Sequence, residues 1–157
     1  VGSVASGVGL YGLSMLYLWA GSLQFDALAA QFVVDGTEPL PLIAMGFVLV
    51  GFGFKVSAAP FHFAAPDAYA GASSPVAGIL ATASKAMGII GLLRMLLIVA
   101  SPEASEDGTV WLTLLGVLSI ITMTWGNIAA LGSKNPKRML AYSSVAHAGY
   151  MLSLIHI

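Results

Sequence analysis

The chain of 157 residues contains no cysteine, which excludes disulfides, thiolate metal sites and cysteine-ligated iron–sulfur clusters. Charged residues are also scarce, at 8% of the sequence, where a soluble domain carries about 25%. The formal net charge of −1 excludes the basic surface of a nucleic-acid-binding protein. The three histidines are too scattered to predict a metal site, and the sequence shows no Gly-rich phosphate loop or nucleophile motif. We therefore expect this chain to bind neither a metal nor a redox cofactor.

Apolar residues are abundant. They make up 58% of the chain, and its mean hydropathy is +0.91. This composition predicts an all-α polytopic membrane protein that forms one transmembrane domain over residues 1–157, with the lipid bilayer as its surroundings. Five apolar segments reach about the 20 residues that a helix needs to cross the bilayer. These predicted spans are 1–23, 40–63, 75–100, 110–131 and 139–157.

The predicted loops differ in charge. Loops 24–39 and 101–109 are acidic, loop 132–138 is basic, and loop 64–74 is short and interrupted by one Pro and one Gly. Positively charged short loops stay on the cytoplasmic side, so 132–138 is predicted to be cytoplasmic. Alternation of the spans then places 64–74 and the N-terminus on the same side and both acidic loops outside. The chain begins and stops inside apolar runs, and we expect it to be an internal piece of a longer protein.

The stretch Phe52–Asp67 is the most unusual part of the sequence, because Lys55 and His62 flank Pro60 in apolar surroundings. A charge at the bilayer centre costs roughly 2.5–3.5 kcal/mol on insertion scales, so Lys55 needs a partner, a water-filled cavity or a neighbouring helix. Pro60 removes a backbone donor and predicts a break in the second span. Broken helices with ionisable groups form the ion sites of transporters. The alternative is a kinked helix whose lysine extends to the interface.

Lys85 lies about ten residues, or roughly 15 Å, into the third span. Gly78, Ala81 and Gly88 share its helical face, and small residues allow close packing of helices. Lys85 is therefore predicted to face the helix bundle. Arg94 lies on the opposite face near the end of the span, where it is expected to extend to the interface.

His147 lies on a polar stripe of the fifth span, with Ser143 four residues before it and Tyr150 three residues after it. Lys55, Lys85 and His147 are thus three ionisable groups at predicted membrane depth. Bridged by water and by hydroxyl groups, they form a plausible proton relay. Two alternatives stay open at this point: the two lysines hold an anionic substrate, or all three residues only support packing.

The residues Phe54-Lys-Val-Ser-Ala-Ala-Pro-Phe-His-Phe, followed by Pro66-Asp-Ala-Tyr, resemble the signature of the antiporter-like subunits of respiratory complex I and of their Mrp-type antiporter relatives. Within that family, Ala81-Thr-Ala-Ser-Lys-Ala and Asn135-Pro-Lys-Arg-Met-Leu-Ala-Tyr-Ser-Ser-Val-Ala-His-Ala-Gly-Tyr resemble the branch of subunit N, the mitochondrial subunit 2. The resemblance covers nearly the whole chain.

The resemblance implies a fold of fourteen helices with two inverted repeats, of which this chain is a fragment. It implies that Lys55 and Lys85 translocate protons, that His62 and His147 belong to the relay, and that a glutamate preceding Val1 pairs with Lys55. It also implies that NAD, FMN, iron–sulfur clusters and quinone are bound by other complex I subunits, which would be the partners of this chain, so quinone acts on it only indirectly. The last residues, 152–157, resemble translated sequencing adapter, so His156 is given no role.

The function expected from the resemblance is that of a proton-translocating, non-redox membrane subunit of a proton-pumping NADH–quinone oxidoreductase, a translocase. Its location would be the bacterial inner membrane. The alternative within the same family is a subunit of a Mrp-type cation/proton antiporter. A scaffold whose lysines merely pair with neighbouring helices is the alternative outside it.

Overall fold

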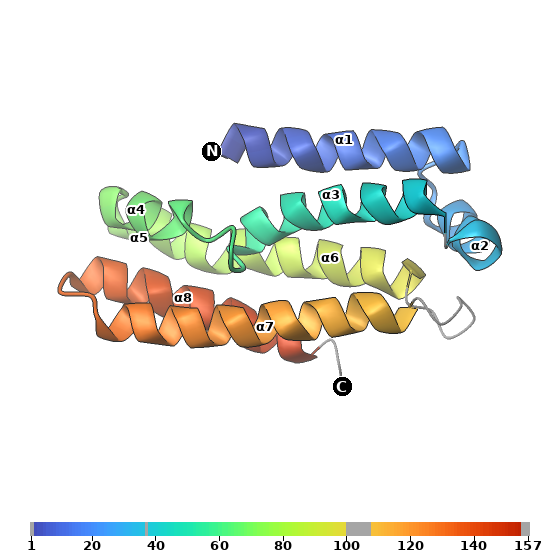
Figure 1. The fold of residues 1–157 in the computed structure, drawn as a ribbon. Coiled ribbons are helices and arrows are strands. Elements are labelled where there is room, and N and C mark those ends of the chain that lie inside the picture. Colours follow the sequence, from blue (N-terminus) through green and yellow to red (C-terminus); the bar gives the residue numbers. More distant parts are fainter. Residues whose placement is uncertain (1, 37, 100–107, 155–157) are drawn as a thin grey trace. The chain divides into compact units, whose positions relative to one another are not determined.

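A computed structural model describes residues 2–36, 38–99 and 108–154, which form helices and their connections and contain no strand (Figure 1). The expectation of an all-α fold is therefore confirmed. The elements are α1 (Gly2–Ala20), α2 (Phe25–Asp35), α3 (Pro39–Val56), α4 (Ala64–Gly71), α5 (Ser74–Ile79), the π-helical turn η1 (Leu80–Ser84), α6 (Lys85–Val99), α7 (Gly108–Leu131) and α8 (Pro136–Ser153).

Among the described residues, four helical segments are long and apolar enough to cross a membrane. They are Gly2–Ala20, Pro39–Val56, Ser74–Leu97 and Trp111–Leu131, and the third of them runs through α5, η1 and α6 without interruption. Helix α8, which carries Lys137, Arg138 and His147, is not among the four. The division into five spans stays a prediction.

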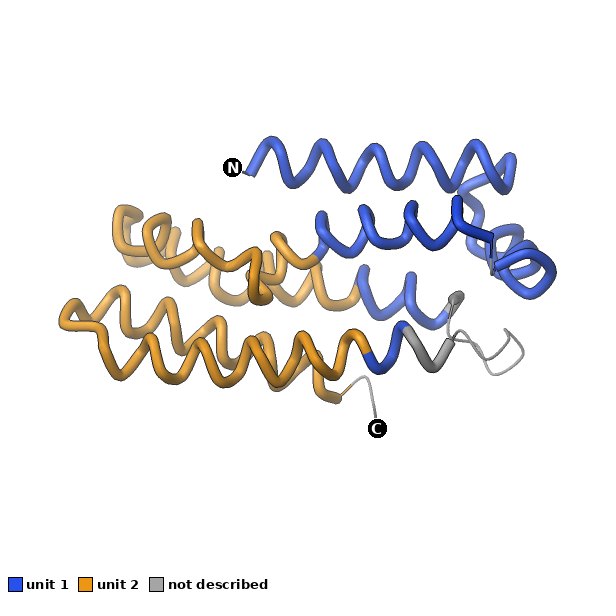
Figure 2. The backbone as a smooth tube through the Cα atoms, in the orientation of Figure 1, with its two compact units in different colours: residues 1–52, 91–113 blue, residues 53–90, 114–157 orange. Residues whose placement is uncertain are grey.

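The chain forms two compact units, coloured separately in Figure 2. Unit 1 consists of residues 1–52 and 91–113, and unit 2 of residues 53–90 and 114–157. Each unit therefore combines segments that are distant in the sequence. Both predicted membrane lysines, Lys55 and Lys85, belong to unit 2.

In unit 1, α1 packs against the part of α3 that precedes Gly53, and the two helices meet at glycine residues. A Cβ atom added to Gly12 would be 2.7 Å from the Ala44 carbonyl oxygen, and one added to Gly9 would be 3.1 Å from the Gly51 Cα. Only glycine permits two backbones to approach so closely. Close van der Waals packing of the two helix surfaces therefore stabilises this contact.

The acidic segment 24–39, which the sequence analysis predicted to be a loop, contains helix α2. Its Leu28 and Phe32, four residues apart, are buried on one face, and Phe32 stacks on Trp19 of α1 with ring centroids 4.9 Å apart. The loop prediction was wrong because the short apolar stripe of Leu28 and Phe32 is enough to bury one face of a helix although the segment also contains acidic residues. Arg94 lies with its guanidinium 4.7 Å from the centre of the Phe25 ring.

In unit 2, α7 and α8 lie side by side and antiparallel (Figure 1). A Cβ atom on Gly126 would be 2.7 Å from the Ala146 nitrogen, and one on Gly149 would be 2.8 Å from the Met123 nitrogen. The Ser119 hydroxyl also donates to the Gly149 carbonyl at 2.8 Å. Two glycines and one buried hydrogen bond thus fix this helix pair.

Helix α3 ends at Val56, and the chain does not resume a helix until Ala64, so the predicted break near Pro60 is confirmed. The helix end is closed by two backbone bonds, from the Ser57 N–H to the Phe54 carbonyl and from the Ala58 N–H to the Gly53 carbonyl. This is the Schellman pattern, in which the residue after the helix adopts a left-handed conformation. Ser57 does so, with φ of 63°, although glycine is usual there.

The short segment 64–74, also predicted to be a loop, is mostly helical because α4 occupies Ala64–Gly71. Pro66 lies in the first turn of this helix, where its missing N–H has no intrahelical acceptor to lose. Of the two prolines in this region, only Pro60 lies in the break between helices, because Pro66 occupies a position in the first turn of α4.

Candidate functional site

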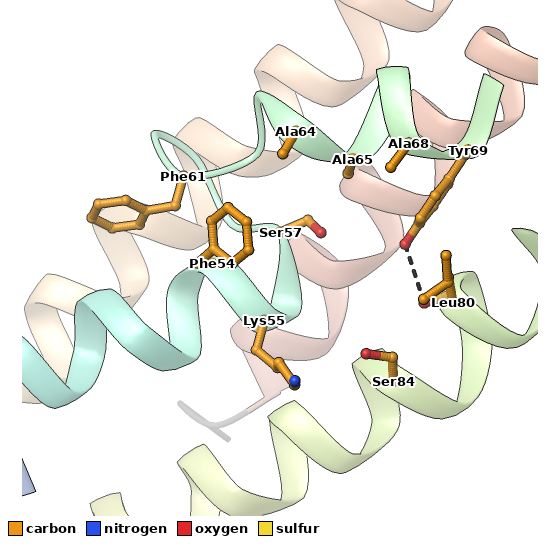
Figure 3. A pocket seen from close by; sticks show the side chains of 10 residues that line it. All are labelled: Phe54, Lys55, Ser57, Phe61, Ala64, Ala65, Ala68, Tyr69, Leu80 and Ser84. Atoms are coloured by element: carbon orange, nitrogen blue, oxygen red, sulfur yellow. Dashed lines mark hydrogen bonds between the residues drawn. The ribbon is translucent and has the colours of Figure 1, made fainter. Parts of the chain in front are cut away.

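A cavity of about 230 Å³ opens where the broken segment faces η1 (Figure 3). Its polar lining comes from Lys55 at the end of α3, Ser57 in the break, Tyr69 in α4 and Ser84 in η1. The remaining lining is apolar: Phe54, Phe61, Ala64, Ala65, Ala68 and Leu80. This volume has room for several water molecules, and the hydroxyl groups supply partners for them.

Lys55 occupies the last turn of α3 and is exposed into this cavity. A Cβ atom on Gly88 would be 3.4 Å from its Cγ, so the apolar stem of Lys55 lies against α6, one turn after Lys85. Among the described residues, no hydrogen bond or ion pair of the Lys55 ammonium is found. Within the described part of the chain, Lys55 is thus held by its apolar stem, and its ammonium makes no bond.

Lys85, at the first position of α6, is 1% exposed. Its Nζ donates to the Ser144 carbonyl oxygen at 2.8 Å and to the Ser144 Oγ at 2.9 Å. The Ser144 hydroxyl donates its own proton to the Ala141 carbonyl, so its oxygen is free to accept from the lysine. The prediction that Lys85 faces other helices agrees with this geometry.

The acceptors of Lys85 are neutral, and in the part of the chain that the structure describes it makes no ion pair. Releasing its proton therefore breaks no ion pair with a carboxylate there. A buried ammonium held by neutral oxygens is chemically suited to exchange protons, whereas a lysine locked to a carboxylate is held in its charged form.

Tyr69 connects the cavity to Lys85. Its ring lines the cavity and has the Lys85 ammonium 5.8 Å from its centre, while its hydroxyl donates to the Leu80 carbonyl at 3.1 Å. Ser57 and Ser144 both lie close to that hydroxyl. The accepting carbonyl belongs to η1, and π-helical turns recur at functional sites in helices.

The break itself is anchored by α7. The Ala59 N–H donates to Thr122 Oγ1 at 3.0 Å in a buried contact, and this hydroxyl donates to the Leu118 carbonyl at 2.6 Å. A broken helix in a membrane leaves backbone groups without partners, so a supporting hydroxyl is needed. Thr122 supplies it.

Within unit 2, two contacts join α8 to the first turn of α4 and to Ala72, the residue that follows α4. The Arg138 guanidinium pairs with the Asp67 carboxylate, and Lys137 Nζ donates to the Ala72 carbonyl at 3.2 Å. Helix α8 starts there with Asn135, whose side chain accepts from the Lys137 N–H, and with Pro136 in the first turn. The basic segment 132–138 thus contacts α4 near both of its ends.

The two histidines are placed apart from the lysine groups. His62 is 4% exposed in the break, with ring centroids 4.6 Å from Phe63 and 5.9 Å from Trp125, and its Nδ1 has no hydrogen-bond partner in the described part of the chain. His147 is exposed on α8, 5.6 Å from the Tyr150 ring, whose hydroxyl accepts from Asn127 at 3.0 Å. Neither histidine lines the Lys55 cavity, so their relay role stays a prediction.

The sequence analysis missed three residues of this site: Tyr69, Thr122 and Ser144. A hydroxyl that bonds to a distant backbone group leaves no periodic trace in a sequence. One signal was available, since Ser119 and Thr122 lie three residues apart in a helical segment and so share one face. Among the described residues no cluster of His, Asp and Glu could hold a metal ion.

The whole chain, residues 1–157, matches the family described as NADH:quinone oxidoreductase/Mrp antiporter, TM. It is 43% identical over 157 residues to NADH-quinone oxidoreductase subunit N of Chlorobium chlorochromatii, covering 96% of this chain and 30% of that protein. It is 46% identical over 152 residues to subunit N of Heliobacterium modesticaldum, covering 97% and 31%. The chain thus spans about 30% of the length of the curated relatives it matches.

Two solved structures have the same fold. Respiratory complex I from Thermus thermophilus contains a chain that is 41% identical, with a TM-score of 0.76, over 96% of this chain and 31% of that one. The Mrp complex from Dietzia sp. contains one with a TM-score of 0.84 and 22% identity, over 99% and 28%, which shows the fold alone. Together with the family match over its full length, these likenesses show that the chain belongs to the NADH:quinone oxidoreductase/Mrp antiporter family of multi-pass membrane proteins.

Proposed function

We propose that this chain is part of a proton-translocating membrane subunit of an NADH–quinone oxidoreductase, of the subunit N type, in a bacterial inner membrane. The observation that carries the proposal is the state of Lys85, a buried ammonium held by two neutral oxygens of Ser144 beside a cavity that contains a second lysine. The likeness to subunit N proteins at 43–46% identity supports the type of subunit.

In this proposal Lys55 takes up a proton from the cavity and Lys85 passes it on along α8, with His62 and His147 as further carriers. Ser57 and Ser84, which line the cavity with Lys55, help to order the water that connects the lysines. Quinone reduction in partner subunits of the complex drives the transfer. This chain has no redox centre, and NAD, FMN, iron–sulfur clusters and quinone are bound by those partners.

The test uses the full-length parent protein within its complex. Lys55→Met and Lys85→Met remove the titratable group and keep an unbranched apolar side chain of similar length. We expect the complex to assemble, and both quinone-reductase turnover and proton uptake into vesicles to fall together. Assembly with normal uptake would show that the lysines only support packing.

The alternative within the family is a Mrp-type cation/proton antiporter. The likeness to the Dietzia Mrp complex shows a shared fold and gives no information on the reaction. Proton uptake in the same vesicles distinguishes the two: a complex I subunit takes up protons when NADH is oxidised, without a sodium gradient. An antiporter subunit requires the opposing cation.

A further inference from the structure

The hydroxyl of Tyr69 lies at the point where three parts of unit 2 meet. It donates to the Leu80 carbonyl in η1, its ring faces the Lys85 ammonium, and Ser57 and Ser144 lie beside it. The side chain is only 8% exposed. Tyr69 is therefore a buried side chain whose hydroxyl and ring both have polar neighbours.

The bond to Leu80 stabilises an unusual helical turn. A π-helical turn is rare and short, so it needs support from outside the helix. Here Tyr69 supplies that support through a hydrogen bond to the first residue of η1, and the Thr82 hydroxyl adds a bond to the Gly78 carbonyl at 2.8 Å within the same segment. Since Lys85 follows η1 directly, the turn determines the direction in which the lysine leaves the helix.

The ring of Tyr69 limits where the Lys85 ammonium can go. The ammonium lies 5.8 Å from the ring centre of Tyr69 in α4 and 2.8 and 2.9 Å from the two Ser144 oxygens in α8, so both helices contribute to its surroundings. The face of an aromatic ring attracts a cation, most strongly where water is excluded. Tyr69 also lines the Lys55 cavity, so the same side chain adjoins both that cavity and the Lys85 ammonium.

We propose that Tyr69 is a positioning residue for proton transfer: its hydroxyl fixes η1 through the Leu80 carbonyl, and its ring thereby holds the Lys85 ammonium against Ser144 at the edge of the Lys55 cavity. This inference rests on the proposed function and adds to it the residue that orients the second lysine. Tyr69 touches no substrate and transfers no proton itself.

The first variant is Tyr69→Phe in the full-length protein within its complex, because it removes the hydroxyl and keeps the ring. We expect proton uptake per unit of assembled complex to fall about fivefold, the factor that one lost hydrogen bond gives. The matched control is Tyr142→Phe on α8, a tyrosine for which no hydrogen bond is found within the described residues. The control is expected to behave as wild type.

Two further variants distinguish positioning from general stabilisation. Replacing Tyr69 by p-aminophenylalanine restores a donor at the same position of the ring and is expected to recover most of the uptake. Tyr69→Phe combined with Lys85→Met is expected to lose no more uptake than Lys85→Met alone, because Tyr69 acts through that lysine. A purely structural defect would add to the loss.

The outcomes separate this proposal from the proposed function. If Lys85→Met lowers uptake while Tyr69→Phe equals the Tyr142→Phe control, the positioning role is wrong and the proton path stands. If p-aminophenylalanine fails to recover activity in an assembled complex, the hydroxyl is not a donor and the proposal fails. If Lys85→Met itself changes nothing, the proposed function fails.

Discussion

The contacts inside unit 1 differ in kind from the contacts inside unit 2. In unit 1, α1 and α3 meet through glycines, and the aromatic pair Tyr11–Phe47 adds to this contact. The hydroxyl of Ser14 and the amide of Gln31 bond within their own helices. In unit 2, polar side chains join segments that are 59–71 residues apart, as in Lys85–Ser144, Ala59–Thr122 and Asp67–Arg138.

This difference follows from what each unit contains. Unit 2 has the broken segment, with freed backbone groups, and a buried lysine, and each of these needs a polar partner where water is absent. Unbroken apolar helices, as in α1, satisfy their backbone internally and need only complementary shape. The comparison therefore locates functional chemistry in unit 2 and predicts different responses to substitution.

The largest effect is expected from Gly126→Val in unit 2. The new side chain would begin 2.7 Å from the backbone nitrogen of Ala146, which cannot move without separating α7 from α8. We expect a loss of roughly 3 kcal/mol or more in stability, seen as a lower yield and a lower melting temperature of the complex. Gly78→Val is the control, since a Cβ atom there meets nothing within 4 Å. Equal losses in both variants would contradict the close contact.

Thr122→Val tests the polar character of unit 2 directly. It keeps the shape of the side chain and leaves the buried Ala59 N–H without its acceptor, at a cost of about 1–3 kcal/mol. Its counterpart in unit 1 is Ser14→Ala, which removes a bond to the Tyr11 carbonyl of the same helix and should cost little. Melting temperatures of the two variants check this. If Ser14→Ala were the more damaging, the contrast between the units would be wrong.

Ser57→Gly is expected to stabilise the protein. A serine at φ of 63° is strained and glycine is not, while the greater freedom of glycine in the unfolded chain offsets part of the gain. We expect a net gain of about 0.5–1 kcal/mol, measured as a higher melting temperature. Ser57→Ala, which keeps a Cβ atom, should give no such gain. A gain from alanine as large as that from glycine would exclude backbone strain as the cause.

The smallest effect is expected from Arg138→Gln. The Asp67–Arg138 pair is roughly half exposed on the arginine side and 72% exposed on the aspartate side, and such pairs contribute about 0–1 kcal/mol. High salt should bring the wild type close to the variant. A loss that is large and independent of salt would show that the pair is buried in the intact protein.

The sequence predicted those parts of the site that are unusual in a membrane-spanning helix, namely charged residues and a proline. Lys55 and Lys85 were conspicuous as charges in apolar spans, and Pro60 predicted the break. Helix α2 and Thr122 left only weak signals, in the apolar stripe of Leu28 and Phe32 and in the face that Thr122 shares with Ser119. The turn η1 and Tyr69 left none. A π-helical turn is the result of packing, and a hydroxyl that pairs with a carbonyl or N–H across the unit depends on distances that exist only after folding.

The central claim, that Lys85 exchanges a proton, is tested most directly by Lys85→Arg. Arginine retains the charge and can donate to both Ser144 oxygens, but it does not release its proton at any physiological pH. We predict an assembled complex whose proton uptake is below about a tenth of the wild-type value, since a carrier that cannot titrate removes the whole contribution of that transfer step. An assembled complex with wild-type uptake would contradict the claim, because a fixed positive charge would then be all that position 85 requires.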